Sequence, residues 1–148
     1  MKDYDLERFV KAQDKNRESY AVALSEIKAG QKQTHWIWYI FPQLMELGYS
    51  QRAKDYGITD IDEAKLYLAH PVLGERLREI SQALLDLESD DANYVMHGYP
   101  DDLKLRSSMT LFAQVSEEGS VFHKVLEKFF DGKQDDETIK LLKKSAKS

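Results

Sequence analysis

Apolar residues recur along most of the chain at intervals of three and four, the spacing that places them on one face of an α-helix. Leu6, Phe9 and Val10 form the first such group. The same spacing returns at positions 20–27, 64–68, 72–87, 105–115, 121–130 and 139–142. No pair of neighbouring segments has the alternation and turn residues of a β-hairpin. The pattern predicts an all-α protein of seven to nine helices.

Residues that start and stop helices divide the chain at the same points. Gly30 and Gly132 follow apolar groups at the position where helices often end in a left-handed residue. Asp60 and Glu63 have the spacing of a capping box, and Pro100 precedes two acids that suit the first turn of a helix. The helix boundaries can therefore be predicted as well as the helix count.

Length and composition agree with one compact domain. The chain has 148 residues, of which 42% are hydrophobic and 32% charged. A domain of this length buries roughly 68–70% of its unfolded surface, which is enough for a core of its own. We expect a single helical domain over residues 1–148, with an ordered core from about 5 to 142 and a basic tail at 143–148.

Charge and composition narrow the classes of function. A net charge of −5 argues against a nucleic-acid partner, and no stretch approaches the ~20 apolar residues that span a membrane. The start of the chain lacks the features of a secretory signal, and there are no cysteines, so a cytoplasmic location is expected. None of the four histidines is spaced three to five residues from another, which predicts no metal site. Nothing resembles a P-loop or a dinucleotide fingerprint, the sequence names no cofactor, and a monomer is favoured.

The segment HWIWYIFPQ at 35–43 is the most aromatic part of the chain. Periodicity does not decide between strand and helix over so short a run. A strand would have no partner here, whereas Thr34 can cap a helix and Pro42 can end it. We therefore predict two helical turns that are apolar nearly all round and lie at the centre of the core. The residues expected in that core are Trp36, Ile37, Ile40 and Phe41.

Other residues in and around this segment carry polar groups that need a partner when buried. They are His35, Trp38, Tyr39 and Gln43. Aromatic rings edged by a few hydrogen-bonding groups are typical of a small-molecule pocket. A buried side chain that bonds to a backbone carbonyl has the same sequence, so both interpretations stay open.

A second candidate segment is PDDLKLRSSMT at 100–110. On a helix, Asp101, Lys104 and Ser108 share one stripe. Lys104 could activate Ser108 or Ser107 as a nucleophile, but the order is wrong for an S-x-x-K arrangement and no glycine-rich turn accompanies it. A surface Lys–Asp pair with serines that pack against other helices is the alternative.

Together these segments resemble a bacterial family known by a domain-of-unknown-function label, family 1810. The resemblance covers about residues 5–142 and rests on DLERFVxAQ at 5–13, THWIWYIFPQL at 34–44, YGI at 56–58, YLAHPVLGERL at 67–77 and PDDLKLRSSMTLF at 100–112. It implies a compact all-helical protein and supplies no established activity. Some members carry the word calpastatin, but that inhibitor is disordered, whereas this chain has capped helices with apolar faces. The residues at the family's motif positions are His35, Trp36, Trp38, Pro42, Gln43, Tyr56, Gly57, His70, Lys104, Ser107 and Ser108.

The leading hypothesis is a cleft between residues 35–43 and 101–108 that binds a small polar or anionic molecule. A tryptophan would offer a stacking face, His35 and Gln43 would offer hydrogen bonds, and Lys104 with Ser108 would offer a counter-charge. The predicted ligand-binding residues are His35, Trp36, Trp38, Gln43, Tyr56, His70, Lys104, Ser107 and Ser108.

Two alternatives belong to other classes of function. One is a scaffold or protein-interaction module without a small ligand, in which the aromatic residues are core and an exposed apolar patch meets a partner. The other is an enzyme that uses His35 or His70 as a general base, although no partner acid or nucleophile is spaced to identify a reaction.

Overall fold

The computed structural model describes residues 4–147, and these fold into ten α-helices and one 3₁₀ helix. The elements are α1 (Glu7–Lys15), α2 (Tyr20–Lys28), α3 (Ile37–Ile40), η1 (Met45–Leu47), α4 (Gln51–Asp55), α5 (Ile61–Ala69), α6 (Leu73–Leu85), α7 (Ala92–Val95), α8 (Asp101–Ala113), α9 (Val121–Phe130) and α10 (Asp136–Lys147). The predicted fold class is confirmed, and the helix count is close to the seven to nine expected. The last helix continues through most of the segment expected to form a basic tail.

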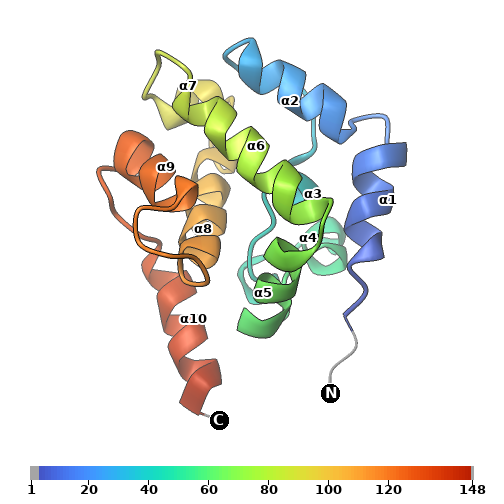
Figure 1. The fold of residues 1–148 in the computed structure, drawn as a ribbon, viewed down its shortest axis with the longest axis vertical. Coiled ribbons are helices and arrows are strands. Elements are labelled where there is room, and N and C mark those ends of the chain that lie inside the picture. Colours follow the sequence, from blue (N-terminus) through green and yellow to red (C-terminus); the bar gives the residue numbers. More distant parts are fainter. Residues whose placement is uncertain (1–3, 148) are drawn as a thin grey trace.

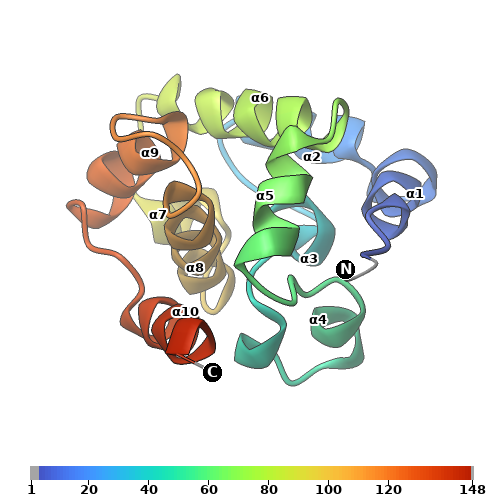
Figure 2. The same cartoon turned by 60° about the horizontal axis from the view of Figure 1, so that its bottom comes forward.

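Helix α6 crosses the molecule and packs against α2, α5 and α9 (Figure 1). Helix α8 contacts α3, α5, α7, α9 and α10. Viewed from the side, α6 and α2 lie along one edge, while α4 and α10 lie at the opposite edge (Figure 2). Helix α10 also contacts η1, which follows the aromatic segment at 35–43.

A line of aromatic rings runs through the core from α1 to α9. The ring centroids of Phe9 and Tyr67 are 5.1 Å apart, those of Tyr67 and Phe112 are 5.3 Å apart, and those of Phe112 and Phe122 are 5.9 Å apart. All four side chains are buried. Such pairs contribute about 0.5–1.5 kcal/mol each beyond the burial of their area. They connect helices that are far apart in sequence.

The helix boundaries largely follow the predicted signals. Gly30 adopts a left-handed φ of 103° just after α2, and the Asp60 carboxylate accepts the N–H of Glu63 at 2.9 Å to start α5. The Glu63 carboxylate reaches one residue further back than a capping box requires, because it accepts the N–H of Thr59 at 2.7 Å.

The aromatic segment forms one helical turn instead of two. Trp36, Ile37, Ile40 and Phe41 are buried as predicted, and α3 ends just before Pro42. The expected cap at Thr34 is wrong, because its hydroxyl donates to the Glu26 carboxylate at 2.7 Å and is not available to the helix. The preceding loop is held in place by a hydrogen bond from the Lys32 N–H to the carbonyl of Val95 at 2.7 Å.

Helix α7 was not expected, since the acidic stretch that contains it has the composition of a solvated loop. Asp91 caps this single turn by accepting the N–H of Tyr94 at 3.1 Å. Within residues 4–147, no helix combines the length and apolar character needed to cross a membrane.

Candidate functional site

The two predicted segments meet at a common cavity. Trp38 and Gln43, from α3 and the stretch after it, lie with Tyr56 and Lys104 around an inner hollow of about 10 Å³. This is about the room that one water molecule needs. Gln43, Ala53 and Lys104 also line an outer cleft of about 450 Å³ that reaches Ser107. The hollow and the cleft therefore share these three lining residues.

A short parallel bridge between Leu44 and Ile58 fixes the main chain of this site. The Ile58 N–H donates to the carbonyl of Gln43, and the Met45 N–H donates to the carbonyl of Ile58, both at 2.9 Å. The backbone of Gln43 is thus held on one side while its side chain lines the cavity. Sequence reasoning found no strand partner for this segment because the bridge involves only one residue pair.

Two glycines let α4 form the wall of the cavity. A Cβ atom on Gly48 would lie 2.2 Å from the Cβ of Ala53, and a Cβ on Gly57 would lie 2.7 Å from the carbonyl oxygen of Ala53. Real Cβ atoms do not approach other atoms so closely. The absence of a side chain at both positions lets Ala53 approach Gln43 and Lys104 across the cavity.

Two cations share the Trp38 ring. The Arg52 guanidinium carbon lies 5.0 Å from the ring centroid, and the Lys104 Nζ lies 5.3 Å from it. Among the described residues, the one carboxylate near Lys104 is that of Asp101, whose Oδ1 is 3.9 Å away, while the other Asp101 oxygen is 2.9 Å from Lys32. Arg52 forms no ion pair with any residue of the described chain. Of the two cations only Lys104 lines the cavity, and its charge is weakly compensated.

The cavity also contains polar groups without partners. The indole Nε1 of Trp38 is buried and makes no hydrogen bond within the described part of the chain. A buried donor without a partner costs about 1–3 kcal/mol, so a bound molecule that accepts a hydrogen bond from Nε1 would recover that energy. The side-chain amide of Gln43 and the hydroxyl of Tyr56 likewise have no hydrogen bond to described residues. The cavity therefore has hydrogen-bond donors beside the positive charge of Lys104.

Ser107, and not Ser108, faces the cleft. Ser108 lies about 100° further around the helix and lines neither the hollow nor the cleft. Ser108 is fully buried, and its hydroxyl has no partner among residues 4–147. The Ser107 Oγ lies 3.1 Å from both the carbonyl oxygen of Leu103 and the Asp135 Oδ2.

Three other predicted site residues lie away from the cavity. Trp36 is fully buried, and its Nε1 donates to Glu26 at 2.9 Å, so it offers no stacking face. His70 starts α6, where its Nδ1 accepts the N–H groups of Val72 and Leu73 at 3.1 and 3.2 Å. His35 is exposed and lines neither the hollow nor the cleft.

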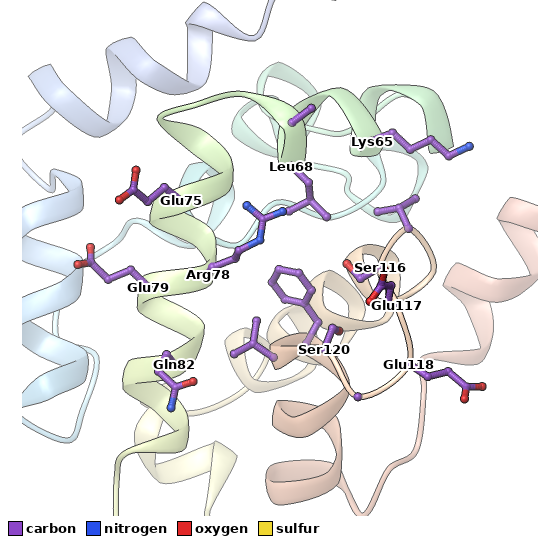
Figure 3. A pocket seen from close by; sticks show the side chains of 15 residues that line it. Lys65, Leu68, Glu75, Arg78, Glu79, Gln82, Ser116, Glu117, Glu118 and Ser120 are labelled. Carbon is purple, nitrogen blue, oxygen red and sulfur yellow. The ribbon is translucent and has the colours of Figure 1, made fainter.

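The largest cavity is a different one. It is an open groove of about 970 Å³ between α5 and α6 on one side and the α8–α9 loop on the other, and neither predicted segment reaches it (Figure 3). Arg78 points into this groove, whereas Glu75 and Glu79 project away from it (Figure 3). None of the buried polar atoms that lack a partner among the described residues belongs to its lining. The smaller cavity at Trp38 is therefore the better candidate site.

The histidines give no sign of catalysis at the cavity. None of the four lines the hollow or the cleft, and His97 and His123, like His70, have partners elsewhere. The Nδ1 of His97 is 3.0 Å from the carbonyl oxygen of Lys32, and that of His123 is 2.7 Å from the Ser120 hydroxyl. Across the part of the chain that the structure describes, no three His, Asp or Glu side chains are grouped as metal ligands.

Glu26 organises the loop that leads into the aromatic segment. Its carboxylate accepts the N–H of Gln33 at 2.7 Å, the N–H and hydroxyl of Thr34 at 3.0 and 2.7 Å, and the Nε1 of Trp36 at 2.9 Å. Burial alone would raise the pKa of Glu26, but these hydrogen bonds outweigh it and hold the pKa below its ordinary value.

This lowered pKa predicts acid-sensitive stability. The folded protein binds the Glu26 proton more weakly than the unfolded chain, whose carboxyl pKa is about 4.3. The stabilisation is complete above that value and is lost as the pH falls through the lowered folded pKa. Urea unfolding measured from about pH 7 to about pH 3 is expected to show a shallower loss of stability in Glu26→Gln than in the original chain. The exposed Glu127→Gln is the control, and equal slopes in all three proteins would contradict the assignment.

The fold and cavity together define a class: an all-helical, single-domain protein with a small hollow in which a lysine lies beside a tryptophan. The family model described as "Protein of unknown function (DUF1810)" matches residues 3–142, and the chain belongs to this family. The resemblance seen in the sequence is thereby confirmed.

A solved structure has the same fold. It is described as the conserved hypothetical protein Rv1873 from Mycobacterium tuberculosis, and it is 41% identical in sequence. The alignment covers 95% of this chain and 97% of that chain, with a TM-score of 0.89. A comparison with curated proteins gave no match.

Proposed function

We propose that the protein binds a small anionic molecule in the cleft between Trp38 and the first turn of α8. The observation that carries the proposal is Lys104, which lines both the hollow and the cleft and whose nearest carboxylate oxygen among the described residues is 3.9 Å away. An ammonium group with so distant a counter-charge is stabilised by a bound anion. A cleft of this kind concentrates a ligand of opposite charge.

Recognition would combine charge with hydrogen bonds. Lys104 supplies an ammonium group, and Trp38 Nε1 and the Gln43 amide supply neutral donors. A carboxylate or phosphate oxygen in the inner hollow would accept from these groups, and charge-assisted bonds of this type are about twice as strong as neutral ones. Leu47 and Leu103 offer apolar contacts to the rest of the molecule in the outer cleft. No reaction is assigned to the site.

The chain's two tryptophans allow a direct test. In Trp36→Phe, Trp38 is the sole tryptophan, and its emission reports on the cavity. Titration with inorganic phosphate, succinate and adenosine monophosphate is expected to change its emission saturably for at least one probe. Lys104→Met should then weaken that binding about tenfold, because the ammonium contributes roughly 1.4 kcal/mol.

Lys11→Met is the matched control for overall charge, since Lys11 is exposed on α1. It should leave the affinity unchanged. Equal weakening in Lys11→Met and Lys104→Met would mean non-specific attraction, and no saturable response to any probe would refute the proposal.

A protein-interaction module is the second candidate, and the rim of the cleft favours it. Tyr49 is 93% exposed, Tyr99 78% and Leu103 40%, and all three line the cleft mouth. Exposed apolar side chains gathered at one place are typical of binding surfaces. Substitution of Tyr49 and Tyr99 by serine separates the candidates, because it would remove a protein contact while leaving a Lys104-dependent anion affinity in place.

A further inference from the structure

The outer cleft changes charge from one side to the other. Lys104 and Ser107 are three residues apart on α8, which is about 4.5 Å along the helix axis. Beside Ser107 lies the start of α10, since the Asp135 Oδ2 is 3.1 Å from the Ser107 Oγ. Asp135 and Glu137 both line the cleft on this side. A molecule that extends along α8 from Lys104 therefore meets acidic groups.

Of these two acids, Glu137 is the one available to a ligand. Asp135 caps α10 and accepts from the Thr138 hydroxyl at 2.6 Å, and Arg106 lies 3.7 Å away as its counter-charge. Glu137 is exposed and forms no ion pair with any described residue, Lys104 included. The cleft thus presents one weakly compensated cation and one uncompensated anion on different sides.

Apolar side chains also line the cleft. Leu103, Tyr99 and Pro100 line the cleft beside Lys104, and each is exposed. Their side chains suit the hydrocarbon part of a ligand, which loses water on contact with them. The cleft therefore combines a basic group, an apolar surface and acidic groups.

We propose that the ligand of this cleft is amphoteric: a carboxylate or phosphate at Lys104 and a protonated amine toward Glu137, joined by a short apolar chain. This inference rests on the anion site proposed above and names its ligand class. A ligand with negative charge at both ends would bring its second charge against Glu137, and one without a second charge would leave Glu137 unused. The cleft thereby discriminates among anions of equal length.

Straight-chain probes that differ only in their end groups test this ligand class. Hexanoate, 6-aminohexanoate and adipate share six carbons and carry one negative charge, two opposite charges and two negative charges. The four- and eight-carbon analogues of each cover other spans. Affinities are measured at low salt through Trp38 fluorescence in the Trp36→Phe protein, and by calorimetry in the original chain.

We expect the amino acid to bind about fivefold tighter than the monocarboxylate at the best length, and the dicarboxylate to bind weakest. Glu137→Gln should bring the three affinities together, while Lys104→Met should weaken all three. Glu118→Gln, an exposed acid on the rim of the open groove, should change nothing.

The outcomes separate this inference from the anion site itself. If adipate binds as tightly as the amino acid, or if the order survives Glu137→Gln, the amphoteric ligand class is wrong although Lys104-dependent binding stands. The class is also wrong if phosphate or succinate binds and no chain of any length does. If no anion binds through Lys104, both proposals fail.

Discussion

Arg8→Met is expected to lower the free energy of unfolding by about 3–5 kcal/mol, the usual loss when one partner of a buried ion pair is removed. The Arg8 Nη1 lies 2.9 Å from the Glu63 Oε2, and Glu63 is only 1% exposed. The same guanidinium donates to the carbonyls of Asp55 and Gly57, both at 2.8 Å. The substitution leaves the buried Glu63 carboxylate without its counter-charge. It also removes the two hydrogen bonds that hold the backbone at the end of α4. Urea unfolding at neutral pH measures the loss.

Arg78→Met is the matched control, because Arg78 is exposed and forms no ion pair with described residues. A second control separates the stranded charge from the lost backbone bonds. Adding Glu63→Gln to Arg8→Met removes the buried charge and should restore part of the stability. A loss below about 1 kcal/mol in Arg8→Met would show that solvent screens the pair as it does on a surface.

This contact also links stability to the candidate site. Arg8 holds the segment from Asp55 to Gly57, and Gly57 lines the inner hollow. The stretch DLERFV therefore supports the cavity from α1 although it contributes no side chain to it. Sequence reasoning treated this region only as the first amphipathic helix, because a role that depends on backbone carbonyls far away in sequence leaves no local pattern.

The helices could be predicted because their signals are local. Ser50 and Ser120 cap α4 and α9, because their hydroxyl oxygens accept the N–H groups of Ala53 and His123 as serine commonly does at such positions. Thr34 has the same chemistry but does not cap α3. The Thr34 hydroxyl donates to the carboxylate of Glu26, eight residues earlier, and only the tertiary fold brings the two groups together.

The candidate site could be predicted only in part, for the same reason. Gln43 and Lys104 carry polar groups on segments with apolar neighbours, so a shared cavity was a reasonable hypothesis. Trp36 and Trp38 could not be told apart, since only the fold decides which indole finds a carboxylate. A role for Glu137 in the cleft could not be predicted, because an exposed acid is common in the first turn of a helix.

Gly57→Ala is expected to have the second-largest effect, a loss of about 3 kcal/mol with weaker anion binding. A Cβ at position 57 would lie 2.4 Å from the Met45 Cα and 2.7 Å from the Ala53 carbonyl oxygen. These are backbone atoms and cannot rotate away. To relieve the contacts, α4 must move from the strand-like stretch at Gln43–Met45, which opens the inner hollow. Urea unfolding and Trp38 fluorescence measure the two effects.

Gly48→Ala provides the comparison that makes this prediction specific. There the new Cβ would meet a side-chain atom, the Cβ of Ala53, at 2.2 Å, while its next neighbour is the Ala53 Cα at 3.5 Å. Adding Ala53→Gly removes that atom and should recover most of the loss, less about 1 kcal/mol for glycine inside a helix. The same second substitution should not rescue Gly57→Ala, because the Met45 backbone and the Ala53 carbonyl remain. Rescue of both variants would show that α4 adjusts freely, and the cavity wall would then be too mobile to hold Trp38, Gln43 and Lys104 in one arrangement.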